Sequence, residues 1–270
     1  MIRLLEWRDP VTQHLWDLPV DRSKPPTEQV IELQNLQELN LIDQQLTSVP
    51  AEIGSLFKLR VLILDTNNLS VLPREIGNIS SLEELILGNN PLSELPATIG
   101  KLTRLTMLDL TLTNLSDLPS EIGYLGNLKS LYVTGGNISK LPAEIGNLSN
   151  LEELYVANAG LTELPPEIGN FKRLIVLVLT LNHLRHLPPE IGNLASLRHL
   201  DIGFNKLKDL PLEIGELRNL EKLNLQQNEL SSLPPEMGKL TNLRLLDLQG
   251  NSIHALPPKL EALPYVSIRQ

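Results

Sequence analysis

One motif of 23 residues recurs from Leu36 almost to the end of the chain and restricts what the chain can fold into. In full form it reads L-x-x-L-x-L-x-x-N-x-L-x-x-L-P-x-E-I-G-x-L, and its copies follow one another without insertion or deletion. The copies open at Leu36, Leu59, Leu82, Leu105, Leu128, Leu151, Leu174, Leu197, Leu220 and Leu243. A fixed period in this range is the signature of a solenoid. We therefore expect one elongated domain instead of separate globular ones.

Each copy of the motif predicts one coil, made of a short strand, a turn and a brief helical return. Leu62 and Leu64 alternate with residues of the other face, which is typical of a half-buried strand. Asn67 can bond backbone groups of the following turn, Pro73 stops strand pairing, and residues 75–79 return the chain. Because stacked strands lie about 4.8 Å apart and the returns are bulkier, the stack is predicted to curve with its strands inside.

Composition excludes several kinds of chemistry. Hydrophobic residues make up 41% of the chain and aromatic residues only 3%, so the core is predicted to be stacked aliphatic side chains. A net charge of −9 without a basic run argues against nucleic acid or an anionic membrane as partner. The absence of cysteine excludes disulfides and thiolate chemistry. No signal-peptide pattern or 18-residue apolar stretch occurs, which favours a soluble, cytoplasmic protein.

The two ends of the chain depart from the period. Residues 1–35 hold both tryptophans and are predicted to form an N-terminal cap, in which 27–35 is half a coil leading into the first strand. Residues 36–265 hold the ten repeats, and 266–270 form the C-terminal end. That end is predicted to stand alone, to contact a second copy or to continue into another domain, and a monomer is the expected state.

The motif resembles that of leucine-rich repeat proteins over about 230 of the 270 residues. Its L-P-x-E-I-G-x-L form, as in residues 164–169 and 187–192, is similar to Ras-group, plant intracellular and bacterial members of that family. The resemblance implies an α/β fold, a right-handed solenoid shaped as a horseshoe, with a parallel β-sheet on the concave face and short helical turns on the convex face. It also implies a non-catalytic module that binds a protein or peptide. Framework residues do not name the partner.

Strand positions that the core does not use form columns on the predicted concave face. The central column reads Asn40, Ile63, Ile86, Asp109, Tyr132, Tyr155, Val178, Asp201, Asn224 and Asp247, apolar in its middle. Exposed tyrosines among aliphatic residues have the composition of an interface hot spot. The predicted partner-binding residues are Tyr132, Tyr155, Val178, Leu181, Phe204 and Met107 as apolar contacts, and Asp109, Asp201, Arg198 and His199 as polar ones. The alternative is that the apolar members are ordinary strand formers on a half-exposed sheet.

In the same stretch the asparagine of the ninth motif position is replaced by Thr113, Gly136 and Ala159. Backbone groups there need other partners, because a buried unpaired group costs about 1–3 kcal/mol. Breaking a structural rule at one place is often functional, although sequence drift explains it equally well.

No catalytic or metal site is predicted, and no cofactor. The spacing of His183, His186 and Glu190 is interpreted as chance, because the histidines follow a strand and do not share a helix face. Neighbouring carboxylates such as Glu83 and Glu84 are interpreted as solvated charge, with a cation or basic-peptide site as the alternative. The glycines of the E-I-G motif are predicted to serve turn geometry, because no phosphate-loop motif occurs.

The predicted function is therefore a protein–protein interaction module that is not an enzyme. Two alternatives remain open: a recognition domain of a larger signalling enzyme, such as a kinase, GTPase or ubiquitin ligase, or a scaffold without a natural ligand.

Overall fold

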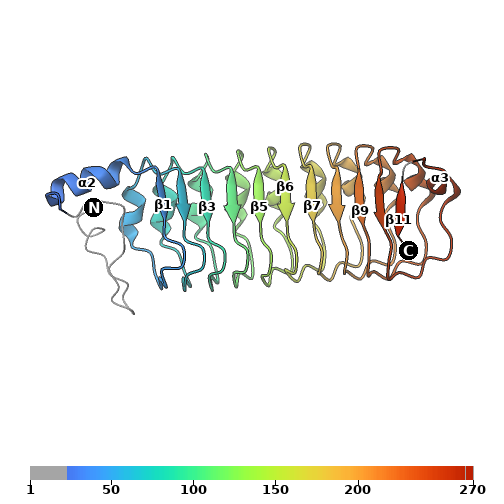
Figure 1. Cartoon of the computed structure of the whole chain (residues 1–270), viewed down its shortest axis with the longest axis horizontal. Helices are drawn as coiled ribbons and strands as arrows, with labels where there is room; N and C mark the ends of the chain where they lie inside the picture. The colour runs from blue at the N-terminus through green and yellow to red at the C-terminus, as the bar shows by residue number, and fades with distance from the viewer. Residues whose placement is uncertain (1–22, 265, 270) are drawn as a thin grey trace.

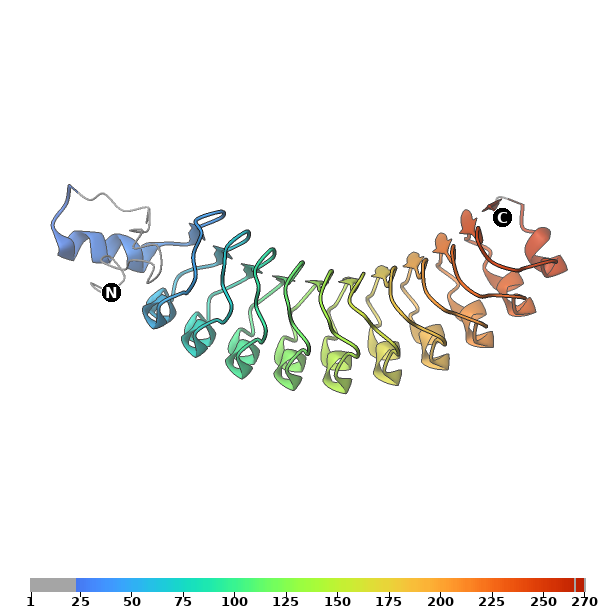
Figure 2. The same ribbon diagram turned by 90° about the horizontal axis from the view of Figure 1, so that it is seen from below.

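The structure, a computed structural model, describes residues 23–264 and 266–269. Much of the predicted N-terminal cap, including both tryptophans, lies outside the described residues. The described chain winds as a curved row of coils (Figure 1). Seen along the strands, the row is an open arc with its strands on the inner side and its helical turns on the outer side (Figure 2). The predicted α/β solenoid, with a parallel sheet on the concave face, is confirmed.

The inner side is one parallel sheet whose eleven described strands follow sequence order. Between β1 and β10, paired residues of neighbouring strands are 23 positions apart, as Leu62 and Leu85 are. The pairing then shifts to 22 positions, from Leu246 to Ile268, so the sheet extends by a strand that the motif did not predict. The strands are β1 Glu38–Asn40, β2 Val61–Ile63, β3 Glu84–Ile86, β4 Met107–Asp109, β5 Ser130–Tyr132, β6 Glu153–Tyr155, β7 Val176–Val178, β8 His199–Asp201, β9 Lys222–Asn224, β10 Leu245–Asp247 and β11 Ser267–Arg269.

The outer side is a row of 3-10 helices, each preceded by a proline in extended conformation that ends the previous segment. These are η1 Ala51–Ser55, η2 Arg74–Asn78, η3 Ala97–Lys101, η4 Ser120–Tyr124, η5 Ala143–Asn147, η6 Pro166–Asn170, η7 Pro189–Asn193, η8 Leu212–Glu216 and η9 Pro235–Lys239. A short α-helix, α3 (Pro258–Glu261), replaces the 3-10 helix in the last repeat. Where half a coil was expected, the ten-residue helix α2 (Pro26–Asn35) buries Leu33 against the first coil.

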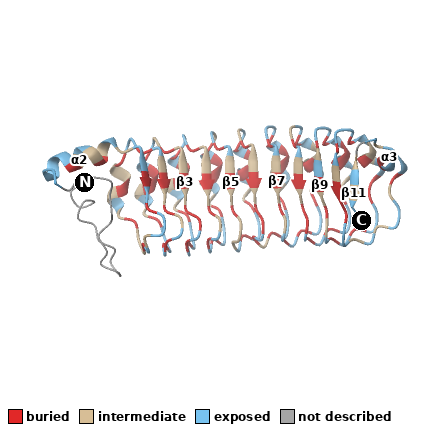
Figure 3. Ribbon diagram, viewed as in Figure 1, coloured by how far each residue is buried: buried red, intermediate tan, exposed pale blue. Residues whose placement is uncertain are grey.

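The core is a single run of aliphatic side chains between the sheet and the outer turns. The middle residue of strands β1 to β10 is buried, and Figure 3 colours the strands by this burial; Leu62, Leu85 and Leu108 are completely buried. Ile76 and Ile79 meet them from the outer side, also with no exposed surface. Each fully buried Leu or Ile contributes about 1.5–3 kcal/mol relative to an exposed one, so the stacking of coils dominates the stability.

The motif glycines serve close contact between coils and not, as predicted, the geometry of the turn. A Cβ on Gly77 would lie 2.3 Å from the carbonyl oxygen of Thr98 in the next coil, too close for any side chain. Among the described glycines, a positive φ occurs at Gly135, Gly160 and Gly250, none of which belongs to this motif position. The E-I-G glycine is therefore explained by the spacing between neighbouring 3-10 helices.

Asparagines at the ninth motif position link each coil to the one before it. Asn67 Oδ1 accepts a hydrogen bond from the Leu46 amide at 2.9 Å, and its Nδ2 donates to the Leu41 and Leu64 carbonyls at 2.8 and 2.9 Å. The pattern recurs at Asn90, Asn182, Asn205, Asn228 and Asn251. The predicted ladder is present, and its gap falls in repeats four to six.

Within this gap, Thr113 retains only part of the pattern, donating from Oγ1 to the Leu110 carbonyl at 2.9 Å. Gly136 has no side chain to offer, although a Cβ there would meet its nearest atom, the Leu115 carbonyl oxygen, at an acceptable 3.4 Å. The middle of the array thus lacks a link that its flanks possess.

Restoring the ladder is expected to stabilise the chain. In Gly136→Asn the new amide can accept from the Leu115 amide and donate to the Leu110 and Val133 carbonyls, which raises the free energy of unfolding by about 1 kcal/mol. Urea denaturation followed by circular dichroism measures the change. The matched substitution Asn90→Ala, which removes an existing link, is expected to lower the same free energy by about 1–3 kcal/mol. A destabilised Gly136→Asn beside a neutral Asn90→Ala would contradict this account of the ladder.

Candidate binding surface on the concave sheet

Two tyrosines stack at the centre of the concave face. The register of β5 and β6 places Tyr132 beside Tyr155, and their rings lie 4.9 Å apart at an angle of 22°. The Tyr132 hydroxyl donates to Glu153 Oε2 at 2.8 Å, which fixes the orientation of its ring. Val178 on β7 is the next residue in the same column, paired with Tyr155. The three predicted apolar contacts Tyr132, Tyr155 and Val178 therefore form a continuous row of half-buried side chains.

The surroundings of the tyrosines favour the neutral phenol. Burial, and then the hydrogen bond to Glu153, raise the pKa of Tyr132 to about 12. Burial raises the pKa of Tyr155 as well, and the Glu153 charge adds to this effect. Both side chains thus present uncharged rings at neutral pH. Such rings are amphipathic and rigid, as interface anchors generally are.

Leu181 and Phe204 lie beyond the strands, in the turns after β7 and β8. Their φ angles are 60° and 55°, and Leu112, in the turn after β4, has a φ of 55°. In this left-handed region a bulky side chain is strained, and glycine and asparagine are favoured instead. All three side chains are at least 43% exposed. Strain of this kind at exposed apolar residues is more common at binding sites than elsewhere.

The predicted polar residues Asp109 and Asp201 hold the turn that follows their strands. Asp109 Oδ1 accepts from the Thr111 amide at 2.8 Å, and Asp201 Oδ1 accepts from the Gly203 amide at 3.0 Å. The same contact two residues ahead occurs at Asn40, Asn224 and Asp247. Sequence reasoning missed this role, although an aspartate or asparagine at a strand end is a known turn signal. Asp109 and Asp201 therefore have a structural role in addition to the predicted contact with a partner.

The remaining predicted residues lie at the margins of the tyrosine row. Met107 begins β4 and His199 begins β8, both half-buried. Burial lowers the pKa of His199. The charge of Asp201 raises this pKa and the charge of Lys222 lowers it, and the net effect is a lowered pKa that favours the neutral imidazole. Arg198 precedes β8, is exposed, and donates from Nη1 to Glu221 Oε1 at 2.6 Å. The predicted residues therefore span repeats four to eight of one face but do not converge on a single pocket.

Sequence reasoning missed two adjoining hollows, of about 450 and 370 Å³, along the edge where the chain enters the strands. We call this region the entry edge. It is lined by Glu83, Arg104, Thr106, Asn127, Lys129, Asn150 and Arg173 in the first hollow, and by Glu152, Arg173, Ile175, Ser196, Arg198 and Asn219 in the second. The signal in the sequence was that basic and amide residues recur, from repeat to repeat, at the last and second positions of the motif.

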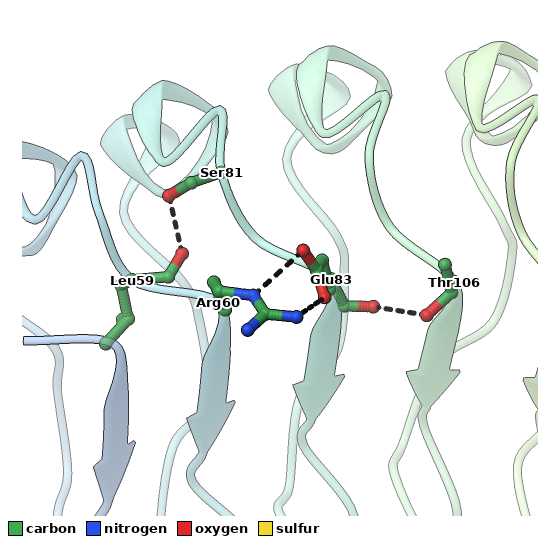
Figure 4. Close-up of polar contacts among 5 residues, drawn as sticks. All are labelled: Leu59, Arg60, Ser81, Glu83 and Thr106. Atoms are coloured by element: carbon green, nitrogen blue, oxygen red, sulfur yellow. Dashed lines mark hydrogen bonds and ion pairs between the residues drawn. The ribbon is translucent and has the colours of Figure 1, made fainter.

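Polar contacts fasten neighbouring coils along the entry edge (Figure 4). Arg60 binds Glu83 through two hydrogen bonds, Nε to Oε1 at 2.9 Å and Nη2 to Oε2 at 2.6 Å. Thr106 Oγ1 donates to the Glu83 carbonyl at 3.0 Å, and Ser81 Oγ donates to the Leu59 carbonyl at 2.6 Å. These contacts link neighbouring coils along the entry edge through its own side chains.

The described residues contain neither a cluster of metal ligands nor a membrane-spanning helix. Across 23–264 and 266–269, no three His, Asp or Glu side chains gather closely enough to hold a metal ion. His186 of the histidine pair instead approaches Asp209, with Nδ1 and Oδ1 3.2 Å apart and both side chains exposed. Within the same part of the chain, no helix has the length and apolar character needed to cross a bilayer.

Comparison with protein families identifies the class. The family model for a leucine-rich repeat region matches residues 85–159 and 134–203. The model for two copies of the leucine-rich repeat matches residues 218–263. The chain belongs to the leucine-rich repeat family, as its motif predicted. The finer resemblance to Ras-group, plant intracellular and bacterial members stays a prediction.

Similar solved structures include ligand-binding receptors. The plant peptide hormone receptor RGFR1, in complex with RGF2, is 32% identical with a TM-score of 0.77, over 89% of this chain and 40% of the receptor chain. A TDR receptor is 30% identical with a TM-score of 0.77, and the match covers 86% of this chain and 42% of the receptor chain. The ectodomain of the Arabidopsis thaliana receptor kinase GASSHO1/SCHENGEN3, in complex with CASPARIAN STRIP INTEGRITY FACTOR 2, is 30% identical, TM-score 0.73, over 82% and 28%. The chain therefore spans less than half the length of each. No curated protein matches it.

The strained turns give a test of stability. Asn89 and Asn158 occupy the turn position of Phe204 with φ of 51° and 49°, so Phe204→Asn places a residue there that tolerates this conformation. We expect the free energy of unfolding to stay the same or to rise by up to about 1 kcal/mol. Thermal unfolding measures it. A clear loss of stability would show that the Phe204 ring supports the fold.

The tyrosine pair gives a test in alkaline solution. Because the pKa of Tyr132 is raised in the folded chain from its ordinary value of 10 to about 12, its neutral form stabilises the fold fully below pH 10. This stabilisation is lost as the pH rises through about 12. Absorbance of the phenolate at 295 nm, followed during alkaline titration, is expected to lose its highest-pH step in Tyr132→Phe. An unchanged titration would mean that this phenol is not shielded.

Proposed function

We propose that the chain is a non-catalytic recognition module that binds a protein or peptide on its concave sheet. The observation that carries the proposal is the stacked pair of Tyr132 and Tyr155, which are half-buried side by side at the centre of the sheet. Such rings contribute a large apolar contact area with little loss of side-chain entropy on binding. Val178 on β7 continues the row.

The turn residues extend this surface toward one rim. Leu181 and Phe204 are 51% and 43% exposed in the turns after β7 and β8. The fold gains nothing evident from strained apolar residues there, and a partner that covers them would remove their contact with water. Asp109, Asp201, Arg198, His199 and Met107 supply the surrounding contacts in this proposal.

Similar proteins support the kind of partner. RGFR1 is a plant peptide hormone receptor solved with RGF2, and GASSHO1/SCHENGEN3 is solved with CASPARIAN STRIP INTEGRITY FACTOR 2; each match spans most of this chain. A peptide or protein ligand is therefore the expected chemistry here too. Because the chain spans less than half of each receptor, it is equally suited to serve as the recognition domain of a larger signalling protein. The length of the parent open reading frame distinguishes these two settings.

Two further properties belong to the proposal. We propose a monomer in solution, which sedimentation measures. We also propose a cytoplasmic setting, supported by the absence of cysteine from all 270 residues, which fractionation of the source cell tests.

Substitution of the two tyrosines tests whether the concave sheet binds the partner. The double substitution Tyr132→Ala with Tyr155→Ala is expected to weaken partner binding on the order of 1000-fold, because two hot-spot residues each contribute about 2 kcal/mol. A partner is first captured from the source cell on the immobilised wild-type chain, then purified, and its Kd is measured by calorimetry. Cooperative thermal unfolding of the variant shows that the fold is retained.

Tyr124→Ala is the matched control. Tyr124 is 67% exposed on the outer helix η4, so its removal deletes an equally large ring from the opposite face. We expect the control to bind like the wild type. If Tyr124→Ala weakens binding and the concave double substitution does not, the convex face is the binding surface and the proposal is wrong.

A further inference from the structure

Basic side chains gather along the entry edge of a chain that is acidic as a whole. The net charge is −9, but the last and second motif positions carry mostly basic charges. The basic residues at these positions are Lys58, Arg60, Arg104, Lys129, Arg173, Arg198 and Arg244, and the acidic ones are Glu83, Glu152 and Glu221. The entry edge is therefore a positive strip on a negative protein, and such local contrast attracts anionic groups.

The acidic residues of the strip are each matched by a basic neighbour. Glu83 is bound by Arg60 at 2.6 Å, and Glu221 by Arg198 at 2.6 Å. Glu152 approaches Lys129 at 3.9 Å. These pairs leave the positive charge in excess elsewhere on the strip.

Within the two hollows, that excess is carried by Arg104 and Arg173. In the described part of the chain neither approaches a carboxylate within 4.0 Å, although the pKa of Glu83, lowered mainly by Arg60, is lowered further by the charge of Arg104. Arg173 lines both hollows, and Arg104 lines the first beside the amides of Asn127 and Asn150. A guanidinium in a hollow is suited to a carboxylate because it can bind both oxygens. Asn127 Nδ2 and Asn150 Nδ2 already donate to the Thr103 and Gly126 carbonyls at 2.8 and 2.7 Å, so each amide has one further N–H to offer.

We propose that the entry edge binds acidic side chains of an extended peptide segment, with Arg104 and Arg173 as its two carboxylate contacts. This deepens the proposed function by naming the chemistry of the ligand, and it rests on that function. Residues Lys129 and Tyr132 share one strand segment, three positions apart, so the strip lies about 10 Å from the tyrosine row. One peptide can therefore place apolar side chains on Tyr132 and acidic ones on the strip.

The repeat sets the spacing that such a peptide needs. Arg104 and Arg173 occupy the same motif position three repeats apart. With strands about 4.8 Å apart, the two positions are separated by about 14 Å, which an extended peptide covers in about four residues. We expect two acidic residues four or five positions apart. A nucleic acid is disfavoured, because an acidic residue follows every two basic ones along the strip and the chain is negative overall.

Selection from a displayed library of random twelve-residue peptides tests the proposal with the full chain as bait. We expect the selected peptides to be enriched in Asp and Glu pairs at the stated spacing. The preferred peptide, labelled for fluorescence anisotropy, is expected to bind about tenfold less tightly to Arg104→Gln with Arg173→Gln, and about tenfold less tightly when its own Glu residues are changed to Gln. Binding is also expected to weaken between 50 and 300 mM salt.

The control substitution removes the same charge from another surface. Arg185 and Lys208 are exposed in the segments after the turns, away from the entry edge, so Arg185→Gln with Lys208→Gln is expected to leave the anisotropy unchanged. If both double variants lose the same peptide affinity, the loss is explained by overall charge alone, and the proposal is overturned. Selected peptides without acidic enrichment, or no enriched peptide at all, would overturn it as well.

The tyrosine variant separates this proposal from the proposed function. If Tyr132→Ala with Tyr155→Ala still selects acidic peptides that depend on Arg104 and Arg173, the entry edge stands and the concave anchors fail. If the acidic preference survives in the arginine variant while binding depends on the tyrosines, the proposed function stands and the entry edge fails.

Discussion

Contact between neighbouring coils is the constraint on which the rest of the structure depends. A coil has a strand of three residues and a 3-10 helix of five, too little to fold alone. Its leucines and isoleucines become buried only when the next coil covers them. This explains why Leu62, Leu85 and Leu108 are identical and fully buried, and why the glycine between adjacent 3-10 helices admits no side chain. The stack fixes the framework and leaves the concave columns free to vary.

That same regularity made most of the fold predictable from the sequence. With a constant period, residues one repeat apart lie side by side, so the neighbours Tyr132 and Tyr155 could be placed without coordinates. The prediction was less accurate at the two ends of the chain, where the 23-residue period breaks. The pairing of Leu246 with Ile268 is one residue short of the period, and β11 was missed for that reason. The segment before β1 formed the longer helix α2, because no preceding motif limits its length.

The finer features of the candidate site could not be read from periodicity. A motif position predicts which face a side chain occupies but not the φ angle of its backbone, so the left-handed turn at Phe204 was not predicted. The local hydrogen bond of Asp109 was likewise not predicted, because its place in the column indicated a contact with a partner. The entry edge needed coordinates because its hollows combine residues of successive coils, such as Arg104 and Lys129, whose separation depends on the curvature.

Three departures from the regular coil coincide in the middle of the array. The asparagine ladder is interrupted at Thr113, Gly136 and Ala159, in the same repeats whose concave column carries the stacked tyrosines. In a linear array, stability is approximately a sum of repeats and their interfaces, so a weak link at the centre is offset by the complete coils on both sides. A globular core would spread such a defect through all its contacts. The solenoid can therefore tolerate a locally irregular surface where a partner is proposed to bind, and keep its fold through the flanks.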